Sequence, residues 1–80
     1  SLSFDRITEE ARITRQLEGT QFDDVYLKDV KVRFGKRLVV SVRLVSPKAI
    51  EGDIMGNIKE KIEAKVGKPV TLEVVSAIEF

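Results

Sequence analysis

The stretch RFGKRL, residues 33–38, joins two segments of alternating apolar and polar side chains, and the length of this connection decides which sides face each other. Successive side chains of a strand point to opposite faces, so one extra residue moves a whole apolar set to the other face. A two-residue turn would set apolar side chains opposite polar ones. A three-residue connection instead pairs Phe34 with Leu38 and puts both apolar sets on one face. We therefore expect a three-residue loop or a glycine bulge between strands at 25–34 and 37–46.

Two helices and a third strand surround this predicted hairpin. Residues 3–18 form an apolar stripe at helical spacing, and residues 20–24 are expected to be a loop. Residues 51–66 repeat an isoleucine every four positions and end at Gly67, a typical helix stop. The third strand is predicted at 69–79. The stripe of the first helix consists of Phe4, Ile7, Ala11, Thr14 and Leu17, with Ile13 outside it.

This order of elements, α-β-β-α-β, predicts a single α+β domain spanning residues 1–80. We expect a three-stranded antiparallel or mixed sheet in which the third strand lies beside the first, giving the strand order 2-1-3. Both helices should cover one face, in a ferredoxin-like arrangement. The opposite face then mixes charged and apolar side chains and stays open.

The composition excludes several chemistries. Lys and Arg number 14 against 13 Asp and Glu, so the net charge is +1 and any basic surface must be local. The chain has no Cys and no His, which removes disulfides, thiolate metal sites and the usual base near neutral pH. The charged fraction of 34% is typical of heat-adapted proteins. We expect no cofactor and no catalysis.

A basic set surrounds the hairpin, and two interpretations of it stand side by side. The side chains could contact phosphate or nucleic acid, or they could keep an exposed hairpin soluble and block pairing at its edge. RNA-binding sheets carry aromatic side chains on the open face, and by strand phase we expect none there. We therefore expect no nucleic-acid partner, and the sequence identifies no small-molecule substrate. The basic set is Lys31, Arg33, Lys36, Arg37 and Arg43.

Three aspartates near the start of the first strand are the only candidate ligands for a hard cation. Carboxylates suit Mg²⁺ or Ca²⁺, but Asp23, Asp24 and Asp29 lack the spacing of a calcium loop. Paired aspartates before a strand are also typical of turns, because Asp bonds its own backbone there. We expect no bound metal.

The open face carries the candidate interface. Its predicted apolar members are Val39, Val45, Val75 and Ala77. Because a half-apolar open face in a small domain often covers a partner, we expect a homodimer or higher oligomer formed through these side chains.

The sequence resembles the C-terminal tail of a prokaryotic family of multi-pass membrane proteins, the uncharacterised hydrophobic-domain family. The similar segments run from an exit-like first helix through VYLKDVKV at 25–32 and VSVRLVSP at 40–47 to VGKPVTLEV at 66–74. The family implies no known catalysis. It implies a tail that follows the last membrane helix, and the start at Ser1 without Met fits a piece of a longer chain. We expect a soluble domain at the cytoplasmic face of the membrane, partnered by the transmembrane part.

A second, fold-level resemblance is to the cytosolic C-terminal domain of cation diffusion facilitators, which is similar in element order and in the glycine between the first two strands. That family binds metal between subunits, often through His, which this chain lacks. Both resemblances imply self-association or regulation in a larger protein. A free-standing RNA- or ligand-binding module is the remaining alternative.

Overall fold

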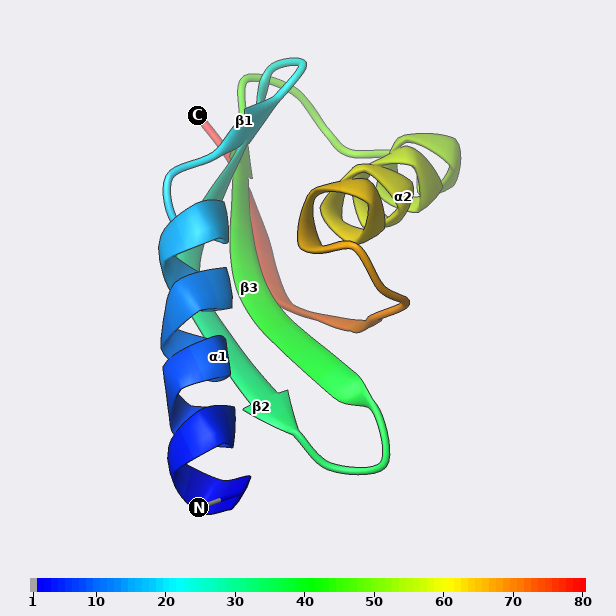
Figure 1. The fold of residues 1–80 in the computed structure, drawn as a ribbon. Coiled ribbons are helices and arrows are strands. Elements are labelled where there is room, and N and C mark those ends of the chain that lie inside the picture. The colour runs from blue at the N-terminus through cyan, green and yellow to red at the C-terminus, as the bar shows by residue number, and fades with distance from the viewer. Residues whose placement is uncertain (1) are drawn as a thin grey trace.

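The structure is a computed structural model that describes the backbone of residues 2–80 and the side chains of residues 5–80. Two helices and a four-stranded mixed sheet form an α+β fold (Figure 1). The α+β class is as predicted, but the sheet has four strands and not the three that were expected. The elements are α1 (Leu2–Leu17), β1 (Gln21–Phe22), β2 (Val25–Phe34), β3 (Leu38–Ser46), α2 (Gly52–Val66) and β4 (Thr71–Glu79). The two-residue strand β1 lies within the segment 20–24 that the sequence predicted as a loop.

The hairpin between β2 and β3 has the predicted register. Phe34 lies opposite Leu38 and Val32 lies opposite Val40, which confirms the three-residue connection. The Gly35 N–H donates to the carbonyl of Arg37 at 3.0 Å and closes the loop. Both apolar sets consequently face the same core.

The strand order is β1-β2-β3-β4, so the predicted order 2-1-3 is wrong. The last strand, β4, pairs in parallel with β3 and does not lie beside β2. Like β2, β3 lies between two strands, and six of its nine side chains are apolar, which suits an inner strand. Its fully or almost fully buried apolar side chains are Leu38, Val40, Val42 and Leu44.

A bulge interrupts β2 at Asp29. Lys28 lies opposite Arg43 and Lys31 lies opposite Ser41, so two residues of β2 stand against one of β3. Asp29 has a φ of 51°, in the left-handed region that Asp and Asn tolerate better than most residues. The bulge therefore inserts one residue without breaking the strand.

This inserted residue keeps one face of β2 apolar. Before the bulge the odd-numbered Val25 and Leu27 are buried, and after it the even-numbered Val30 is buried. Without the extra residue, one half of β2 would turn its apolar side chains to solvent. This switch from odd to even buried positions explains why the sequence alternates cleanly only after Asp29.

A second bulge lies in β4 at the same height of the sheet. Val42 is opposite Val74 and Arg43 is opposite Ser76, which leaves Val75 as the extra residue. The two strands that flank β3, namely β2 and β4, thus carry bulges on either side of the same point in β3. Bulges increase the local twist of a sheet, and a matched pair bends both neighbours of β3 together.

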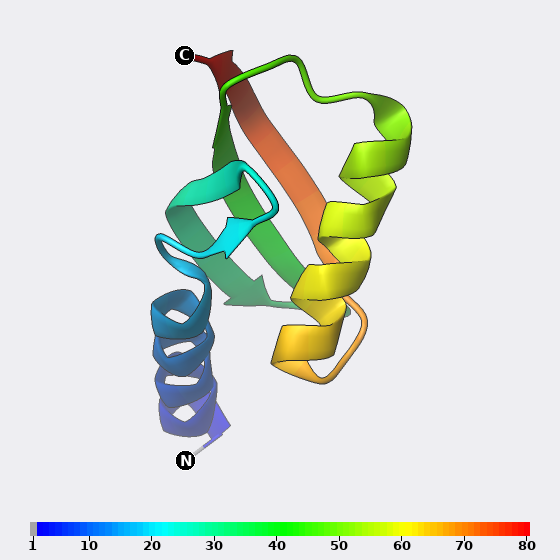
Figure 2. The ribbon, with the colours of Figure 1, turned by 90° about the horizontal axis from the view of Figure 1, so that it is seen from above.

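Helix α2 covers one face of the sheet (Figure 2). Its three buried side chains are Ile58, Ile62 and Val66. It ends at Val66, and the next residue, Gly67, has a left-handed φ of 86°, which confirms the predicted helix stop at Gly67. The buried side chains of both helices pack in one core with the apolar face of the sheet.

Helix α1 is rotated relative to the predicted stripe. Ile13 and Leu17 are fully buried, although Ile13 was expected outside the stripe, whereas Ile7 is 64% exposed and Ala11 is also exposed. The side chain of Phe4 lies outside the described residues. The helix lies along the edge of β2, where only a narrow side of it meets the core.

Two carboxylates, one on α1 and one directly after it, hold this position by accepting hydrogen bonds from the free edge of β2. Glu10 accepts from the Phe34 N–H and Glu18 accepts from the Val30 N–H, both at 2.8 Å. The distance between the two carboxylates matches the distance between the two amides, because eight helical residues span about 12 Å and four strand residues span about 13 Å. These bonds satisfy edge amides and explain why the helix turns Glu10 inward in place of Ile7.

The left-handed conformation of Asp29 gives a test of the bulge. Asp29→Val should lower the free energy of unfolding by about 1–2 kcal/mol, because a β-branched residue is strained at positive φ. Asp29→Gly should stay within about 0.5 kcal/mol of the wild type, since its exposed contact with Arg43 contributes little. The measurement is urea unfolding followed by circular dichroism.

Lys31→Val is the matched control, two residues along the same strand and also exposed. It should change the free energy of unfolding by no more than about 0.5 kcal/mol. Equal losses for Asp29→Val and Lys31→Val would contradict a special backbone requirement at Asp29.

Candidate functional site

The open face is the side of the sheet turned away from the helices, and it consists of four rows of side chains across β2, β3 and β4. The register sets these rows as Tyr26, Val45 and Ile78; Lys28, Arg43 and Ser76; Lys31, Ser41 and Glu73; and Arg33, Val39 and Thr71. One end of the face is therefore apolar and the rest carries most of its charge. This is the mixed surface that the sequence predicted.

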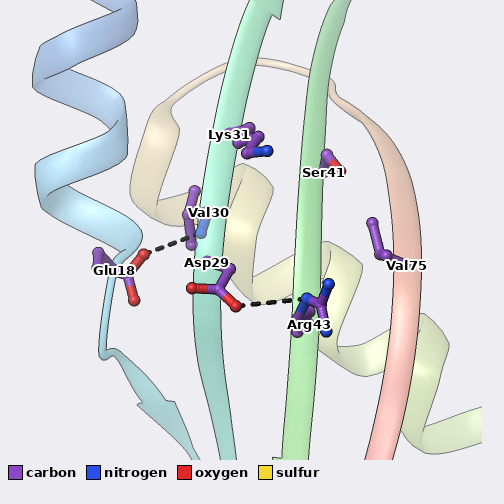
Figure 3. Close-up of a pocket in the computed structure, with 7 residues that line it drawn as sticks. All are labelled: Glu18, Asp29, Val30, Lys31, Ser41, Arg43 and Val75. Carbon is purple, nitrogen blue, oxygen red and sulfur yellow. Dashed lines mark hydrogen bonds and ion pairs between the residues drawn. The ribbon is translucent and has the colours of Figure 1, made fainter.

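A hollow of about 420 Å³ lies in the middle of the open face, between the two bulges (Figure 3). Glu18 reaches into it from the end of α1 and bonds the Val30 amide, while the Arg43 Nε and the Asp29 carboxylate are 3.3 Å apart. Its lining residues are Glu18, Asp29, Val30, Lys31, Ser41, Arg43 and Val75. Since both carboxylates already have partners, the hollow is a structural feature of the bulged sheet.

The predicted basic set is divided between two places. Arg33 forms an ion pair with Glu73 at 3.1 Å and Arg43 pairs with Asp29, so both guanidinium groups of the open face are partly neutralised. Lys31 lies beside them on the same face. Lys36 and Arg37 lie in the hairpin connection and line a different hollow. The five side chains therefore do not form one patch.

The three candidate metal ligands do not converge. Asp23 pairs with Lys61 of α2 at 2.8 Å, and its φ of 57° marks it as a turn residue, while Asp29 occupies the bulge. Across residues 2–80, no three acidic side chains lie close enough together to hold a metal ion. Asp23 and Asp29 thus have structural contacts with cations of the chain itself.

The predicted interface set is mostly on the open face. Val39 and Val45 are half-buried there, and Val75 is 59% exposed. The expectation for Ala77 is wrong, because the bulge at Val75 shifts the phase of β4 and sets Ala77 opposite Leu44 on the helix side. Ile78 takes its position on the open face and is 49% exposed.

The open face also holds an aromatic side chain, contrary to the prediction. Tyr26 lies opposite Val45, and the Lys28 ammonium is 6.0 Å from the centre of its ring. The error comes from extending the phase of the second half of β2 back through Asp29. The broken alternation at Lys28 and Asp29 was the signal that could have revealed the bulge.

The two edges of the sheet differ. The edge of β2 is occupied by β1 at its start and by the carboxylates of α1 farther along. In contrast, β4 pairs only with β3 within the part of the chain that the structure describes. Three apolar side chains near this bare edge, Val75, Ile78 and Phe80, are 49–69% exposed. The edge of β4 and the apolar end of the open face form one continuous candidate site.

Comparison with family models, with curated proteins and with solved structures finds no match to this chain. Neither α1 nor α2 is long and apolar enough to cross a membrane. The functional assignment therefore depends on the site itself.

The covered edge of β2 gives a test of the contrast between the two edges. Glu18→Ala should lower the free energy of unfolding by about 1–2 kcal/mol, because the Val30 amide loses its acceptor. It should also speed hydrogen exchange of that amide. Urea unfolding and exchange followed by NMR measure the two effects.

Glu60→Ala is the control, because Glu60 is an exposed carboxylate of α2 and should change the stability by no more than about 0.5 kcal/mol. Glu18→Gln keeps an acceptor oxygen and should recover most of the loss. If Glu18→Ala leaves the exchange rate of Val30 unchanged, the carboxylate does not protect this edge.

Proposed function

We propose that this chain is a non-catalytic association module that pairs with a second copy of itself through the edge of β4 and the adjoining apolar end of the open face. The module serves to hold together, or to regulate, a larger protein. The observation that supports this proposal best is the contrast between the protected edge of β2 and the bare edge of β4.

Proteins commonly protect an exposed edge with Lys, Pro or a covering element. The segment from Thr71 to Glu79 is nine residues long and contains neither Lys nor Pro. Its unpaired backbone groups offer a template for another strand. Two copies related by a twofold axis would pair β4 with β4 antiparallel, and such an interface closes on itself.

The apolar side chains beside this edge favour a protein partner. Val75 and Ile78 are exposed residues of β4 on the open face, and Phe80 directly follows the strand. Pairing of the two edges would bring each set close to its copy and remove apolar surface from water, which stabilises association in proportion to the area buried. The bulge at Val75 limits how many backbone bonds the pair can form.

We further propose that the larger protein is embedded in a membrane and that the module lies on its cytoplasmic side. The support is the resemblance of residues 25–32, 40–47 and 66–74 to the tail of the uncharacterised hydrophobic-domain family. In the cation diffusion facilitators, which share the element order, metal joins the subunits. The separation of Asp23 from Asp29 favours association without metal in this chain.

Nucleic acid is a weaker candidate for the open face. Tyr26 provides a single stacking surface, whereas sheets that bind RNA stack two or three bases on their aromatic side chains. Arg33 and Arg43 are paired with carboxylates, and the net charge is only +1. Our proposal therefore assigns the face to a protein contact.

Sedimentation equilibrium of wild-type protein and of Val75→Lys tests the proposal. The wild type should form a dimer in the presence of chelator, and Val75→Lys should raise the dissociation constant about tenfold or more, because a lysine blocks edge pairing. Ile7→Lys is the matched control, since it adds the same charge at an equally exposed side chain on α1. It should leave the dissociation constant unchanged.

Two results would contradict the proposal. A wild-type monomer at every concentration would exclude self-association of this segment. A dimer that forms only with divalent metal would instead favour the cation-transporter alternative, with the aspartates as ligands.

A further inference from the structure

A second hollow, of about 460 Å³, lies at the opposite end of the sheet from the apolar row. Its lining comes from three separate segments, namely the β2–β3 connection, the last turns of α2 and the α2–β4 connection. The lining residues are Lys36, Arg37, Leu38, Lys59, Glu63, Lys68, Pro69, Val70 and Thr71. We call this set the cationic hollow.

The parallel pairing of β3 and β4 creates the cationic hollow. Val39 lies opposite Thr71, so the residues that precede the two strands meet at the same end of the sheet. In Figure 1 the α2–β4 connection lies beside the last turn of α2, and the β2–β3 connection lies below it. Cations that are about thirty residues apart in the sequence, such as Lys36 and Lys68, therefore line one cavity.

The charge of the cationic hollow is strongly positive. Four cations line it against a single carboxylate, Glu63, and this carboxylate already accepts a hydrogen bond from the Val70 N–H at 2.9 Å. Within residues 2–80, Lys36, Arg37 and Lys59 form no ion pair. In contrast, Arg33 and Arg43 on the open face each form an ion pair with a carboxylate.

The fourth cation, Lys68, has only weak partners. Its ammonium lies 3.9 Å from a Glu9 oxygen and 5.4 Å from the centre of the Phe34 ring. Glu9 is bonded mainly by Arg12, whose Nε lies 3.0 Å from the other carboxylate oxygen. Lys68 is therefore held at the rim of the hollow and remains able to bind an anion.

The floor of the cationic hollow is apolar. Leu38 and Val70 are each 5% exposed, and Pro69 lies beside them. Charges above such a floor are less screened by water than charges on an open surface, so the lysines and the arginine attract an anion with two negative charges more strongly there. The floor also suits the carbon part of a ligand that carries the anion.

We propose that the cationic hollow binds a phosphate monoester, with Lys36, Arg37 and Lys59 around the phosphate and the floor of Leu38, Pro69 and Val70 against its organic part. Arg suits a phosphate because its guanidinium can donate two parallel hydrogen bonds, and lysines add mobile point charges. The same chemistry is present in a soluble phosphorylated metabolite and in the headgroup of a phosphatidic acid. The site lies at the starting end of β4, away from Val75, Ile78 and Phe80, and does not depend on self-association.

NMR titration of the whole 80-residue chain with inorganic pyrophosphate tests whether the site binds phosphate. Binding to phosphatidylcholine vesicles with and without phosphatidic acid tests whether the phosphate belongs to a lipid headgroup or to a soluble molecule. Pyrophosphate should shift the backbone amide signals of residues 36–38, 68, 70 and 71. The double variant Lys36→Ala with Arg37→Ala should weaken binding about tenfold or more, and added salt should weaken it further. Binding to vesicles only when they contain phosphatidic acid, and loss of that binding in the double variant, would identify a lipid headgroup as the source.

The matched control is Arg15→Ala with Lys65→Ala, which removes one Arg and one Lys from exposed helix positions outside the hollow. This control should bind like the wild type. Equal weakening by both double variants would show general attraction to a cationic chain and would overturn the proposal. The absence of binding both to pyrophosphate and to the anionic vesicles would also overturn it.

Discussion

The two-residue period of a β-strand is the constraint on which this fold depends, and the bulge at Asp29 is how β2 meets it. The strand has its apolar residues at odd positions before the bulge and at even positions after it. One inserted residue in the left-handed conformation brings both halves to the same face. The buried core, the composition of the open face and the position of Tyr26 all follow from this single residue.

The order of the strands decides where the surface features lie. Because β3 takes the centre, β4 is an outer strand, with an edge that is bare and a starting end that meets the hairpin. The bare edge of β4 is the candidate contact surface, and the meeting of its starting end with the hairpin forms the cationic hollow. Two features at opposite ends of the sheet thus have one topological cause, although their chemistry differs.

The sequence predicted the features that depend on local patterns. The α+β class, the register of Phe34 with Leu38 and the stop at Gly67 follow from periodicity and turn chemistry. It did not predict strand order, because a crossover connection can reach either side of a hairpin. It also misplaced Ala77 and Tyr26, since a bulge reverses the phase of everything beyond it. The rotation of α1 was missed because hydrogen bonds from strand amides to Glu10 and Glu18, and not apolar spacing alone, set it.

The attachment of α1 also bears on how far such a sheet can grow. In the proposed dimer, α1 would leave only one edge able to accept a strand, so pairing between copies would stop at two. The helix has few residues in the core, mainly Ile13 and Leu17, and its remaining contacts include two carboxylate bonds. If a local opening released α1, the sheet would have two free edges and could add copies without limit as a fibril. In the proposed assembly, the first helix would therefore limit the growth of a polymer as well as form part of the fold.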